Sequence, residues 1–288
     1  SGCNRLQSIK LSKKIQTINQ RLLQGCYSLS EIQIPEGVKT IGYAAFSSCN
    51  KLTTITLPAS LTSFNGTALA GLTRLTEVKI ASGNNSFKFE NGILLSKDGR
   101  TMYMALLTLT EINVPNGVVS IVGDTLSGSS ATKIILPDTV GANLSGTVFN
   151  GMNKLTTIEL SSTSKNLKLV DGNLYSYDGK RFIKYMGTSK TFTVPEGVET
   201  LCPGCITKSM TTLNLPSTLK VIDGWSLTGV SGVKLLNIPD SVTTIGAGAF
   251  ESCSSLIEIT IPQSVTSIGS DAFVYCGKLM AINIKGGG

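Results

Sequence analysis

The sequence predicts a repeat solenoid built mainly from β-strands, because one short pattern recurs along the whole chain. Cys3, Cys26 and Cys49 are 23 residues apart, and Cys253 and Cys276 keep the same step. Prolines repeat it as well, at Pro35 and Pro58 and again at Pro216, Pro239 and Pro262. A fixed period of roughly 20 to 50 residues is the sequence signature of a stacked repeat array. Such an array offers an extended surface more naturally than a single catalytic pocket.

Each unit begins with a strand that has one buried face. In residues 52–57, apolar side chains alternate at the end of the segment with the polar Thr54 and Thr56, which is the period of a half-buried strand. Pro58 then removes a backbone donor and ends the strand. A second extended segment follows, as in residues 38–42, and a turn that buries Phe46. One unit cannot cover these residues alone, so we expect three-sided coils stacked in parallel sheets.

About twelve units can be counted from the last residue of each predicted strand. These residues are Leu11, Ile34, Leu57, Ile80, Val114, Leu136, Leu160, Val194, Leu215, Ile238, Ile261 and Ile284. The steps between them are 23 residues or close to it, except that Ile80 to Val114 and Leu160 to Val194 are each 34 residues long. The two long units therefore carry insertions.

The insertions are expected to be two β-hairpins that project from the solenoid, near residues 87–105 and 167–186. Asn91–Arg100 matches Asp171–Lys180, and in both an Asp-Gly pair stands between apolar runs. An Asp-Gly pair favours a type I′ turn, because that turn needs a positive φ at both central residues. We therefore place the hairpin turns at Asp98-Gly99 and Asp178-Gly179.

Residues 34–49 resemble the BspA-like, or treponemal-type, leucine-rich repeats, and the same pattern returns at 238–253 and 261–276. The inserted hairpins are similar to those that interrupt such arrays. The resemblance covers almost the whole chain, although residues 131–148 and 202–210 depart from it. It implies a secreted or surface-attached protein, and an adhesion role that only some family members have.

We interpret residues 1–288 as one elongated solenoid domain, since a solenoid grows without needing a larger core. The chain opens with Ser1-Gly2 directly before a repeat cysteine and ends in Gly286-Gly287-Gly288. This indicates a fragment of a longer exported protein that lacks its export signal. No run of eighteen apolar residues exists, so no membrane span is predicted. A monomer located outside the cell or on its surface is expected.

The seven cysteines are predicted to be free thiols rather than a disulfide framework or a metal site. Five of them share one repeat position, where a ladder of small buried thiols is expected. Equivalent side chains in stacked strands point in parallel, whereas a disulfide needs a dihedral angle of about 90°. Cys202 and Cys205 form a C-x-x-C pair, but they occupy the positions of Gly42 and Ala45, so we expect packing rather than redox chemistry.

Catalysis is not predicted, because the chain contains no histidine. Nucleophile pairs that depend on histidine and histidine-based zinc sites are therefore excluded. The acidic residues form no clustered motif and recur on the outward face of strands. No catalytic residue, cofactor or metal ligand is assigned.

The predicted binding residues lie on the second hairpin and at Trp225. Residues 165–190 have a net charge of +4 and also hold several aromatic residues. Pairing about Asp178-Gly179 would place two aromatic residues opposite each other on one face. The predicted contact residues are Tyr175, Tyr177, Arg181, Phe182, Lys184 and Trp225. The alternative is that one face of this hairpin simply packs on the solenoid and the other is an ordinary exposed surface.

The sequence thus favours a non-enzymatic module, displayed on a surface, that contacts a protein or glycan of a host or neighbouring cell. A structural spacer that holds another domain away from the cell is the alternative. Glycan binding by the second hairpin is a third hypothesis. Nucleic acid is not an expected partner, because no nucleic-acid motif is present.

Overall fold

The computed structural model describes residues 2–285, and their backbone consists of short strands, turns and two 3₁₀-helices. Ser1 and Gly286–Gly288, on which the interpretation as a fragment rests in part, lie outside the described residues. The chain divides into two compact units. Unit 1 comprises residues 1–141 and 148–163, and unit 2 comprises residues 142–147 and 164–288.

The strands of unit 1 are β1 (Thr17–Ile18), β2 (Thr40–Ile41), β3 (Thr54–Leu57), β4 (Ser63–Phe64), β5 (Glu77–Ile80), β6 (Phe87–Glu90), β7 (Ile93–Ser96), β8 (Thr101–Ala105), β9 (Glu111–Asn113), β10 (Ser120–Ile121), β11 (Lys133–Leu136) and β12 (Thr157–Leu160). The 3₁₀-helix η1 (Gly66–Leu69) also lies in unit 1, whereas η2 (Gly146–Phe149) contains one of the three points at which the chain passes between the units.

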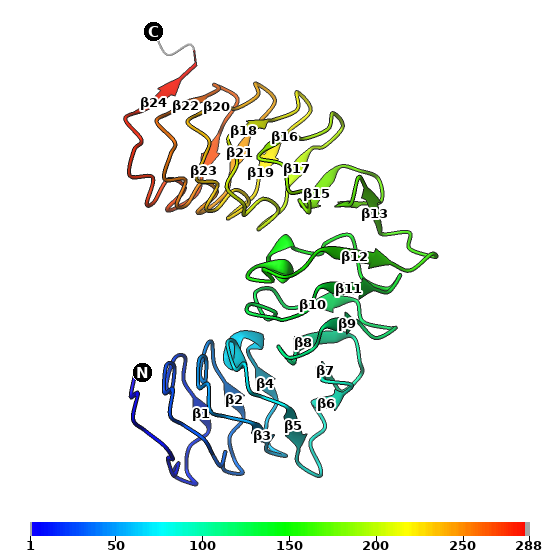
Figure 1. Cartoon of the computed structure of the whole chain (residues 1–288), viewed down its shortest axis with the longest axis vertical. Helices are drawn as coiled ribbons and strands as arrows, with labels where there is room; N and C mark the ends of the chain where they lie inside the picture. Colours follow the sequence, from blue (N-terminus) through cyan, green and yellow to red (C-terminus); the bar gives the residue numbers. More distant parts are fainter. Residues whose placement is uncertain (1, 286–288) are drawn as a thin grey trace. The chain divides into compact units, whose positions relative to one another are not determined.

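The strands of unit 2 are β13 (Leu167–Val170), β14 (Asn173–Ser176), β15 (Arg181–Lys184), β16 (Thr191–Thr193), β17 (Thr200–Leu201), β18 (Thr212–Asn214), β19 (Val221–Ile222), β20 (Leu235–Asn237), β21 (Thr244–Ile245), β22 (Glu258–Ile261), β23 (Ser267–Ile268) and β24 (Ala281–Ile284). Within each unit, the strands of successive coils lie side by side (Figure 1).

The predicted fold class is confirmed: the chain forms a β-solenoid of about 12 turns, with parallel sheets and almost no helix. The longer strands pair in the predicted register. Leu57 lies opposite Ile80, Leu136 opposite Leu160, and Ile261 opposite Ile284. We call these longer strands (β3, β5, β9, β11, β12, β16, β18, β20, β22 and β24) the main strands.

A second set of short strands forms the next side of each coil. In unit 2, β15, β17, β19, β21 and β23 pair in parallel in one sheet, and in unit 1, β1, β2 and β4 do the same. Turns close the coil, and several of their residues have a positive φ. Non-glycine examples include Arg21, Ala44, Ser48, Asp124, Trp225, Ser252, Asp271 and Tyr275. These left-handed residues recur at equivalent positions, so the coil geometry requires them.

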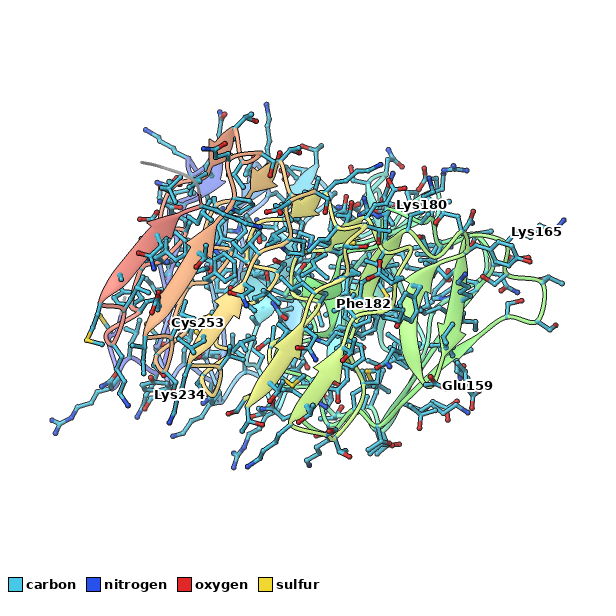
Figure 2. The ribbon with its side chains drawn as sticks, turned by 90° about the horizontal axis from the view of Figure 1, so that it is seen from above. Glu159, Lys165, Lys180, Phe182, Lys234 and Cys253 are labelled. Atoms are coloured by element: carbon cyan, nitrogen blue, oxygen red, sulfur yellow. The ribbon has the colours of Figure 1, made fainter. Side chains whose placement is uncertain are left out.

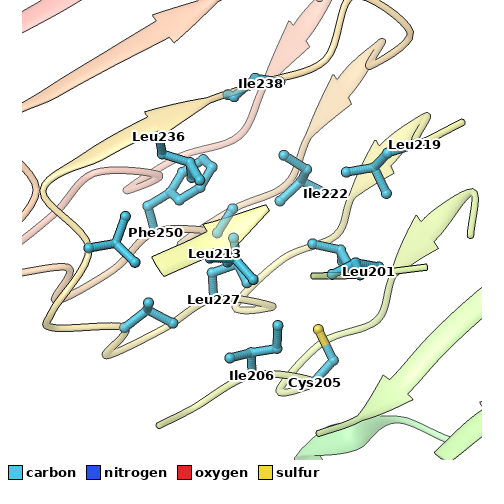
Figure 3. Close-up of a cluster of buried hydrophobic side chains, with 14 of the residues drawn as sticks. Leu201, Cys205, Ile206, Leu213, Leu219, Ile222, Leu227, Leu236, Ile238 and Phe250 are labelled. Atoms are coloured by element: carbon cyan, nitrogen blue, oxygen red, sulfur yellow. The ribbon is translucent and has the colours of Figure 1, made fainter. Parts of the chain in front are cut away.

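Apolar side chains fill the interior of each unit. The residues expected to be buried in the second and third coils are buried: Leu52, Leu57 and Phe46 are 0% exposed and Ile55 is 1% exposed. In unit 2, Leu213, Leu236 and Phe250 pack inside the coils with the side chains labelled around them (Figure 3). Each coil therefore covers the apolar side chains of its neighbour, and for this reason a single coil is not expected to fold alone.

Both insertions contain the predicted hairpins, but they do not project from the solenoid. In the first, β6, β7 and β8 pair antiparallel, and β8 then pairs in parallel with β10. In the second, β13, β14 and β15 pair in the same way, and β15 continues into the sheet through β17. The prediction of projecting hairpins is wrong, because each insertion extends an existing sheet.

The type I′ turns lie one hairpin earlier than predicted. Asn91 and Gly92 have φ of 51° and 77°, and Asp171 and Gly172 have φ of 50° and 75°, so these pairs join β6 to β7 and β13 to β14. At the predicted sites only Gly99 (77°) and Gly179 (80°) have positive φ. The turns at Asp98-Gly99 and Asp178-Gly179 are therefore longer, with the glycine alone in the left-handed region.

Candidate binding surfaces

The second insertion buries three of the residues that were predicted to form a contact surface. Tyr175 is 4% exposed, Phe182 is 0% exposed and Lys184 is 6% exposed. Figure 2 shows Phe182 within the ribbon, whereas Lys165 and Lys180 reach outward from it. The prediction that these three residues belong to an exposed site is wrong.

Aromatic packing explains the burial of this face. Tyr175 does lie opposite Phe182, as predicted. Their ring centroids are 5.0 Å apart, and Phe192 packs against Phe182 at 5.4 Å and against Tyr185 at 4.5 Å. Burial, with a smaller effect of the Asp171 charge, raises the pKa of Tyr175 to about 12. Tyr175, Phe182 and Tyr185 are therefore core residues of unit 2.

The opposite face of the second insertion is also covered. Leu174 and Ile183 are both 0% exposed, so neither face of the β14–β15 pair is an open surface. Lys184 satisfies its ammonium group internally: Nζ donates to the carbonyl oxygen of Gly204 at 2.9 Å and to Oγ1 of Thr207 at 3.2 Å. From the sequence, one face of this hairpin was expected to be exposed, either as a contact site or as an ordinary surface. The structure differs from both expectations, because both faces of the β14–β15 pair are buried.

Two predicted contact residues of this insertion keep some exposure. Tyr177 is 57% exposed next to the turn at Asp178, and Arg181 is half-buried. Burial raises the pKa of the Cys202 thiol to about 11, and the charge of Arg181 partly offsets this effect. Lys180 makes an ion pair of 3.0 Å with Glu199, which in turn pairs with Lys220 at 3.0 Å. A contact role for Tyr177 and Arg181 stays a prediction.

The cysteines carry free thiols, and their positions follow the repeat. Cys26, Cys49 and Cys253 are buried as predicted, and burial raises the pKa of Cys49 to about 11 and that of Cys253 to about 12. Cys3, however, is exposed, and Cys276 is half-buried, so the prediction of buried thiols fails for Cys3.

The Cys202/Cys205 pair lies in the interior of unit 2. Both residues are 0% exposed, and Cys205 packs where the repeat has Ala45, as predicted. The Cys205 thiol donates to the carbonyl oxygen of Ser226 at 3.4 Å, and burial raises its pKa well above the usual range. A neutral thiol is a poor nucleophile, so this geometry does not favour redox chemistry.

The outward face of the main strands differs between the two units. In unit 1 it is charged: Lys133 lies between Glu111 at 3.6 Å and Glu159 at 3.0 Å, and Lys79 pairs with Glu77 at 3.6 Å. These residues are largely exposed, so the pairs are worth little stability each. They give the face an alternating charge along the stack.

In unit 2 the same face is almost neutral. We call it the neutral face, and its residues are Thr191, Thr193, Thr212, Asn214, Leu235, Asn237, Glu258, Thr260, Ala281 and Asn283. Leu235 is 66% exposed in the middle of this row. Asn214 Nδ2 donates to Thr193 Oγ1 at 3.0 Å, and Asn283 Nδ2 donates to Glu258 Oε1, so neighbouring strands are linked across the face.

Sequence reasoning missed Leu235. The signal was present, since Leu235 stands at the outward position that Thr212 and Glu258 hold in neighbouring coils. An apolar side chain at an outward position breaks the alternation of a half-buried strand. It is the residue of the neutral face that water solvates least well.

Trp225, the predicted contact residue outside the second insertion, lies on the outside of a turn. It is 52% exposed, and its φ of 53° is in the left-handed region. Unit 1 has exposed aromatic residues on its turns too: Tyr27 is 49% exposed and Tyr43 45% exposed, and the Arg21 guanidinium lies 5.5 Å from the centroid of the Tyr43 ring.

A cavity of about 760 Å³ lies in unit 1. Its lining includes Lys10 and Lys13 together with Glu31 and Glu36, so it carries no net preference for one sign of charge. Among residues 2–285 no group of three potential metal ligands comes together. No helix in that range has the length and apolar character needed to cross a bilayer.

The coil geometry, the buried leucine and isoleucine ladder and the two insertions define a leucine-rich repeat solenoid. The family described as "BspA type Leucine rich repeat region" matches the chain in six copies over residues 1–91, 99–177 and 179–287. The chain therefore belongs to the BspA-type leucine-rich repeat family. None of the curated proteins matches the sequence.

Solved structures share the fold at low sequence identity. A leucine-rich repeat protein from Eubacterium ventriosum is 20% identical, with a TM-score of 0.52 over 89% of this chain and 73% of that one. A leucine rich cell surface protein from Faecalibacterium prausnitzii is also 20% identical, with a TM-score of 0.46 over 98% of this chain and 79% of that one. The pneumococcal vaccine antigen PcpA is 18% identical, with a TM-score of 0.46 over 97% of this chain and 68% of that one. At these identities the likeness shows the fold alone.

Proposed function

We propose that this chain is a non-enzymatic binding module, displayed outside the cell, that contacts a protein of a host or neighbouring cell. The family suggests a protein-interaction or adhesion module located at the surface or outside the cell. The proposal goes further by assigning the contact to the neutral face of unit 2.

The observation that carries this proposal is Leu235, which is 66% exposed in the middle of a row of Thr, Asn and Ala side chains with one acid, Glu258, opposite it on β22. The central part of protein interfaces is depleted in charged residues and encloses apolar anchors. The outward face of unit 1 is less suited to this role, because its Glu and Lys side chains already pair with one another. Association with the neutral face would desolvate few charges, so its cost in polar desolvation is low.

The experiment is an adhesion assay with beads that carry the chain, applied to epithelial cells and to a panel of purified extracellular matrix proteins. Leu235→Lys should reduce attachment at least about 10-fold, because a charge at the centre of an interface is costly to bury. Lys79→Leu, which changes one side chain on the outward face of unit 1, is the matched control and should leave attachment unchanged. Equal attachment by both variants would contradict the assignment.

A structural spacer is the alternative function. Beads that fail to attach to any cell or matrix protein, although the chain on them is folded, would favour it. If Leu235→Lys attaches normally while Tyr177→Ala and Arg181→Ala do not, the contact lies on the second insertion as the sequence suggested.

A further inference from the structure

Trp225 occupies a turn position at which the fold does not need a large side chain. The equivalent left-handed residues on other coils are Arg21, Ala44, Asp124, Gly204, Gly248 and Asp271. A bulky residue with a positive φ is a genuine outlier, and it costs free energy that glycine does not. Since several different residue types fill this position, the coil requires only its backbone geometry. The indole is therefore an addition to the turn, at a conformational cost that a functional role would explain.

The neighbouring coil provides a seat for the indole ring. A methyl group placed on Gly248 would lie 2.5 Å from the indole Nε1 and 2.7 Å from Cδ1, so the pyrrole part of the ring rests on the Gly248 backbone. Gly248 is buried beneath it, whereas Trp225 remains 52% exposed. Any larger residue at position 248 would push the ring away. The ring is thus held by a bare stretch of backbone and presents its remaining surface to solvent.

Backbone hydrogen bonds fix this turn to the coils on both sides. The Trp225 N–H donates to the carbonyl oxygen of Ala247 at 3.0 Å, and the Gly204 N–H donates to the carbonyl oxygen of Trp225 at 3.0 Å. The indole consequently projects from a rigid part of the array rather than from a long loop. A ring that is already ordered loses little conformational entropy when a ligand binds to it.

The surroundings of the ring are polar and acidic. Asp271 holds the same left-handed position on the coil beyond Gly248 and is exposed. At roughly 4.8 Å per coil, Asp271 is about 10 Å from Trp225 along the stack and one coil beyond the Gly248 backbone on which the indole rests, so a ligand that extends past the ring can reach its carboxylate. Asp223, two residues before Trp225 in the same coil, is half-buried and accepts the N–H of Gly224 at 2.8 Å. Thr228 adds a hydroxyl group that donates to the Gly248 carbonyl oxygen at 3.3 Å.

We propose that Trp225, seated on Gly248, is a carbohydrate-binding platform on which a pyranose ring stacks. A pyranose has a face of C–H groups that matches an aromatic surface, and hydroxyl groups at its rim that can donate to carboxylates such as Asp271. The same carboxylates disfavour the phosphates of nucleic acid. A protein partner would require apolar or aromatic neighbours around the tryptophan, and here they are aspartate, threonine and glycine.

This site is independent of the proposed contact on the neutral face. Trp225 follows β19 on a turn, whereas Leu235 lies on the outward side of β20. Loss of attachment in Leu235→Lys therefore does not bear on the platform, and loss of sugar binding in a Trp225 variant does not bear on the neutral face.

The first test uses intrinsic fluorescence, because Trp225 is the only tryptophan in the chain. An array of mammalian and microbial oligosaccharides identifies binders, and lactose, N-acetyllactosamine and chitobiose serve as soluble probes. A bound sugar should shift the emission of Trp225 to shorter wavelength and protect it from acrylamide quenching. If no oligosaccharide on the array and none of the soluble probes binds, the proposal is overturned.

The second test separates binding from folding with Trp225→Gly. Glycine adopts a positive φ without strain, so this variant should keep or raise the Tm while binding to the array falls at least about 10-fold. Tyr275→Gly is the matched control, since Tyr275 is 74% exposed with a φ of 59° on another turn of unit 2. Tyr275→Gly should bind like the parent chain. Undiminished sugar binding by Trp225→Gly would refute the platform.

Two smaller changes probe the geometry. Gly248→Ala should displace the ring and weaken binding several-fold, with a change in the emission of Trp225 even before sugar is added. Asp271→Asn should weaken binding by about 3-fold, because an amide accepts sugar hydroxyls less strongly than a carboxylate. If both variants bind sugar with the affinity of the parent chain, the proposed roles of Gly248 beneath the indole and of the Asp271 carboxylate are contradicted.

Discussion

The two insertions share a backbone but differ in what they enclose. In both, a two-residue turn of Asx-Gly is followed by a longer turn in which Ser hydroxyl, Asp carboxylate and backbone N–H are linked by the same hydrogen bonds. Ser96 donates to Asp98 and Ser176 donates to Asp178, each at 2.6 Å. The Arg100 N–H donates to Asp98, and the Lys180 N–H to Asp178, each at 3.0 Å.

The interiors of the insertions are different. Ile93 and Met104 of the first insertion are apolar and buried, whereas the second has Asn173 and Lys184 at those positions, at 6% exposure each. Asn173 Oδ1 accepts the Met186 N–H at 2.9 Å, and Lys184 reaches two oxygen acceptors. One backbone therefore accepts either an apolar or a polar interior, provided that the polar groups find partners. Lysine and tyrosine gathered on an insertion can indicate packing rather than binding.

The largest effect expected from this difference is on stability. Met104→Lys should cost more than about 3 kcal/mol, because it places a charge within the hydrophobic cluster of unit 1. Lys184→Met should cost only about 1–2 kcal/mol, since it removes hydrogen bonds but leaves a side chain of similar volume. Urea unfolding monitored by circular dichroism measures both. Equal decreases in the free energy of unfolding would mean that the interiors of the two insertions do not differ in polarity as described.

The next largest loss of stability is expected at the glycine of each 3₁₀-helix that lies against a strand of an insertion. A Cβ on Gly146 would collide with the carbonyl oxygen of Ile183, and a Cβ on Gly66 would lie 2.5 Å from the Thr125 methyl group and 2.7 Å from the Tyr103 carbonyl oxygen. Gly146→Ala should destabilise by about 3 kcal/mol and Gly66→Ala by about 2 kcal/mol, because a side-chain methyl can move more readily than backbone. Thermal unfolding tests this order, and a neutral Gly146→Ala would contradict the close contact.

Thiol labelling should show how well the second insertion and its neighbouring turn are shielded. Burial raises the pKa of Cys202 to about 11, so at about pH 8 only on the order of one thiol in a thousand is ionised in the folded chain. In native buffer, a maleimide should modify Cys3 first and leave Cys202 and Cys205 unmodified, as mass spectrometry of the peptides would show. In urea without reductant, most of the seven cysteines should react. Rapid native labelling of Cys205 would indicate an open interior.

The smallest effect on stability is expected at the turns around Asp98 and Asp178, which have the same hydrogen bonds in both insertions. Hydrogen bonds from serine and from the backbone lower the pKa of Asp98 and of Asp178 below 3.8. A carboxyl whose pKa is lower in the folded state stabilises the fold above its unfolded pKa, and this contribution disappears as the pH falls through the folded value. Asp98→Asn and Asp178→Asn should each lower the Tm by at most about 3 °C near pH 7. The effect of each substitution should disappear as the pH falls through the folded pKa of the carboxyl, which lies below 3.8. Unequal shifts would show that the turns are not equivalent.

The fold could be predicted from the sequence because the same interior position recurs in every coil. Residues such as Leu52 and Ile55 alternate with polar neighbours and stop at a proline, so their burial follows from period alone. The turn assignment failed for a definable reason. Asn91-Gly92 and Asp98-Gly99 are both Asx-Gly pairs, and only the length of the loop decides which of them needs two left-handed residues.

The candidate site could be predicted only in part. Trp225, a predicted contact residue, is exposed on a turn. The burial of Tyr175 and Phe182 could not be read from the hairpin, because which face of a strand is covered depends on neighbours distant in sequence. Leu235 was visible in the pattern as an apolar residue at an outward position, and it marks the surface that we now propose for contact.

Site-specific photocrosslinking tests the central claim that contact occurs on the neutral face and not on the second insertion. A benzophenone side chain is placed at position 235 in one variant and at position 177 in another, since both native residues are well exposed. Each variant is illuminated on the cells or matrix protein to which the parent chain attaches. We expect a covalent adduct with the partner from position 235 and none from position 177. Adducts from position 177 alone would place the contact on the insertion and contradict the account.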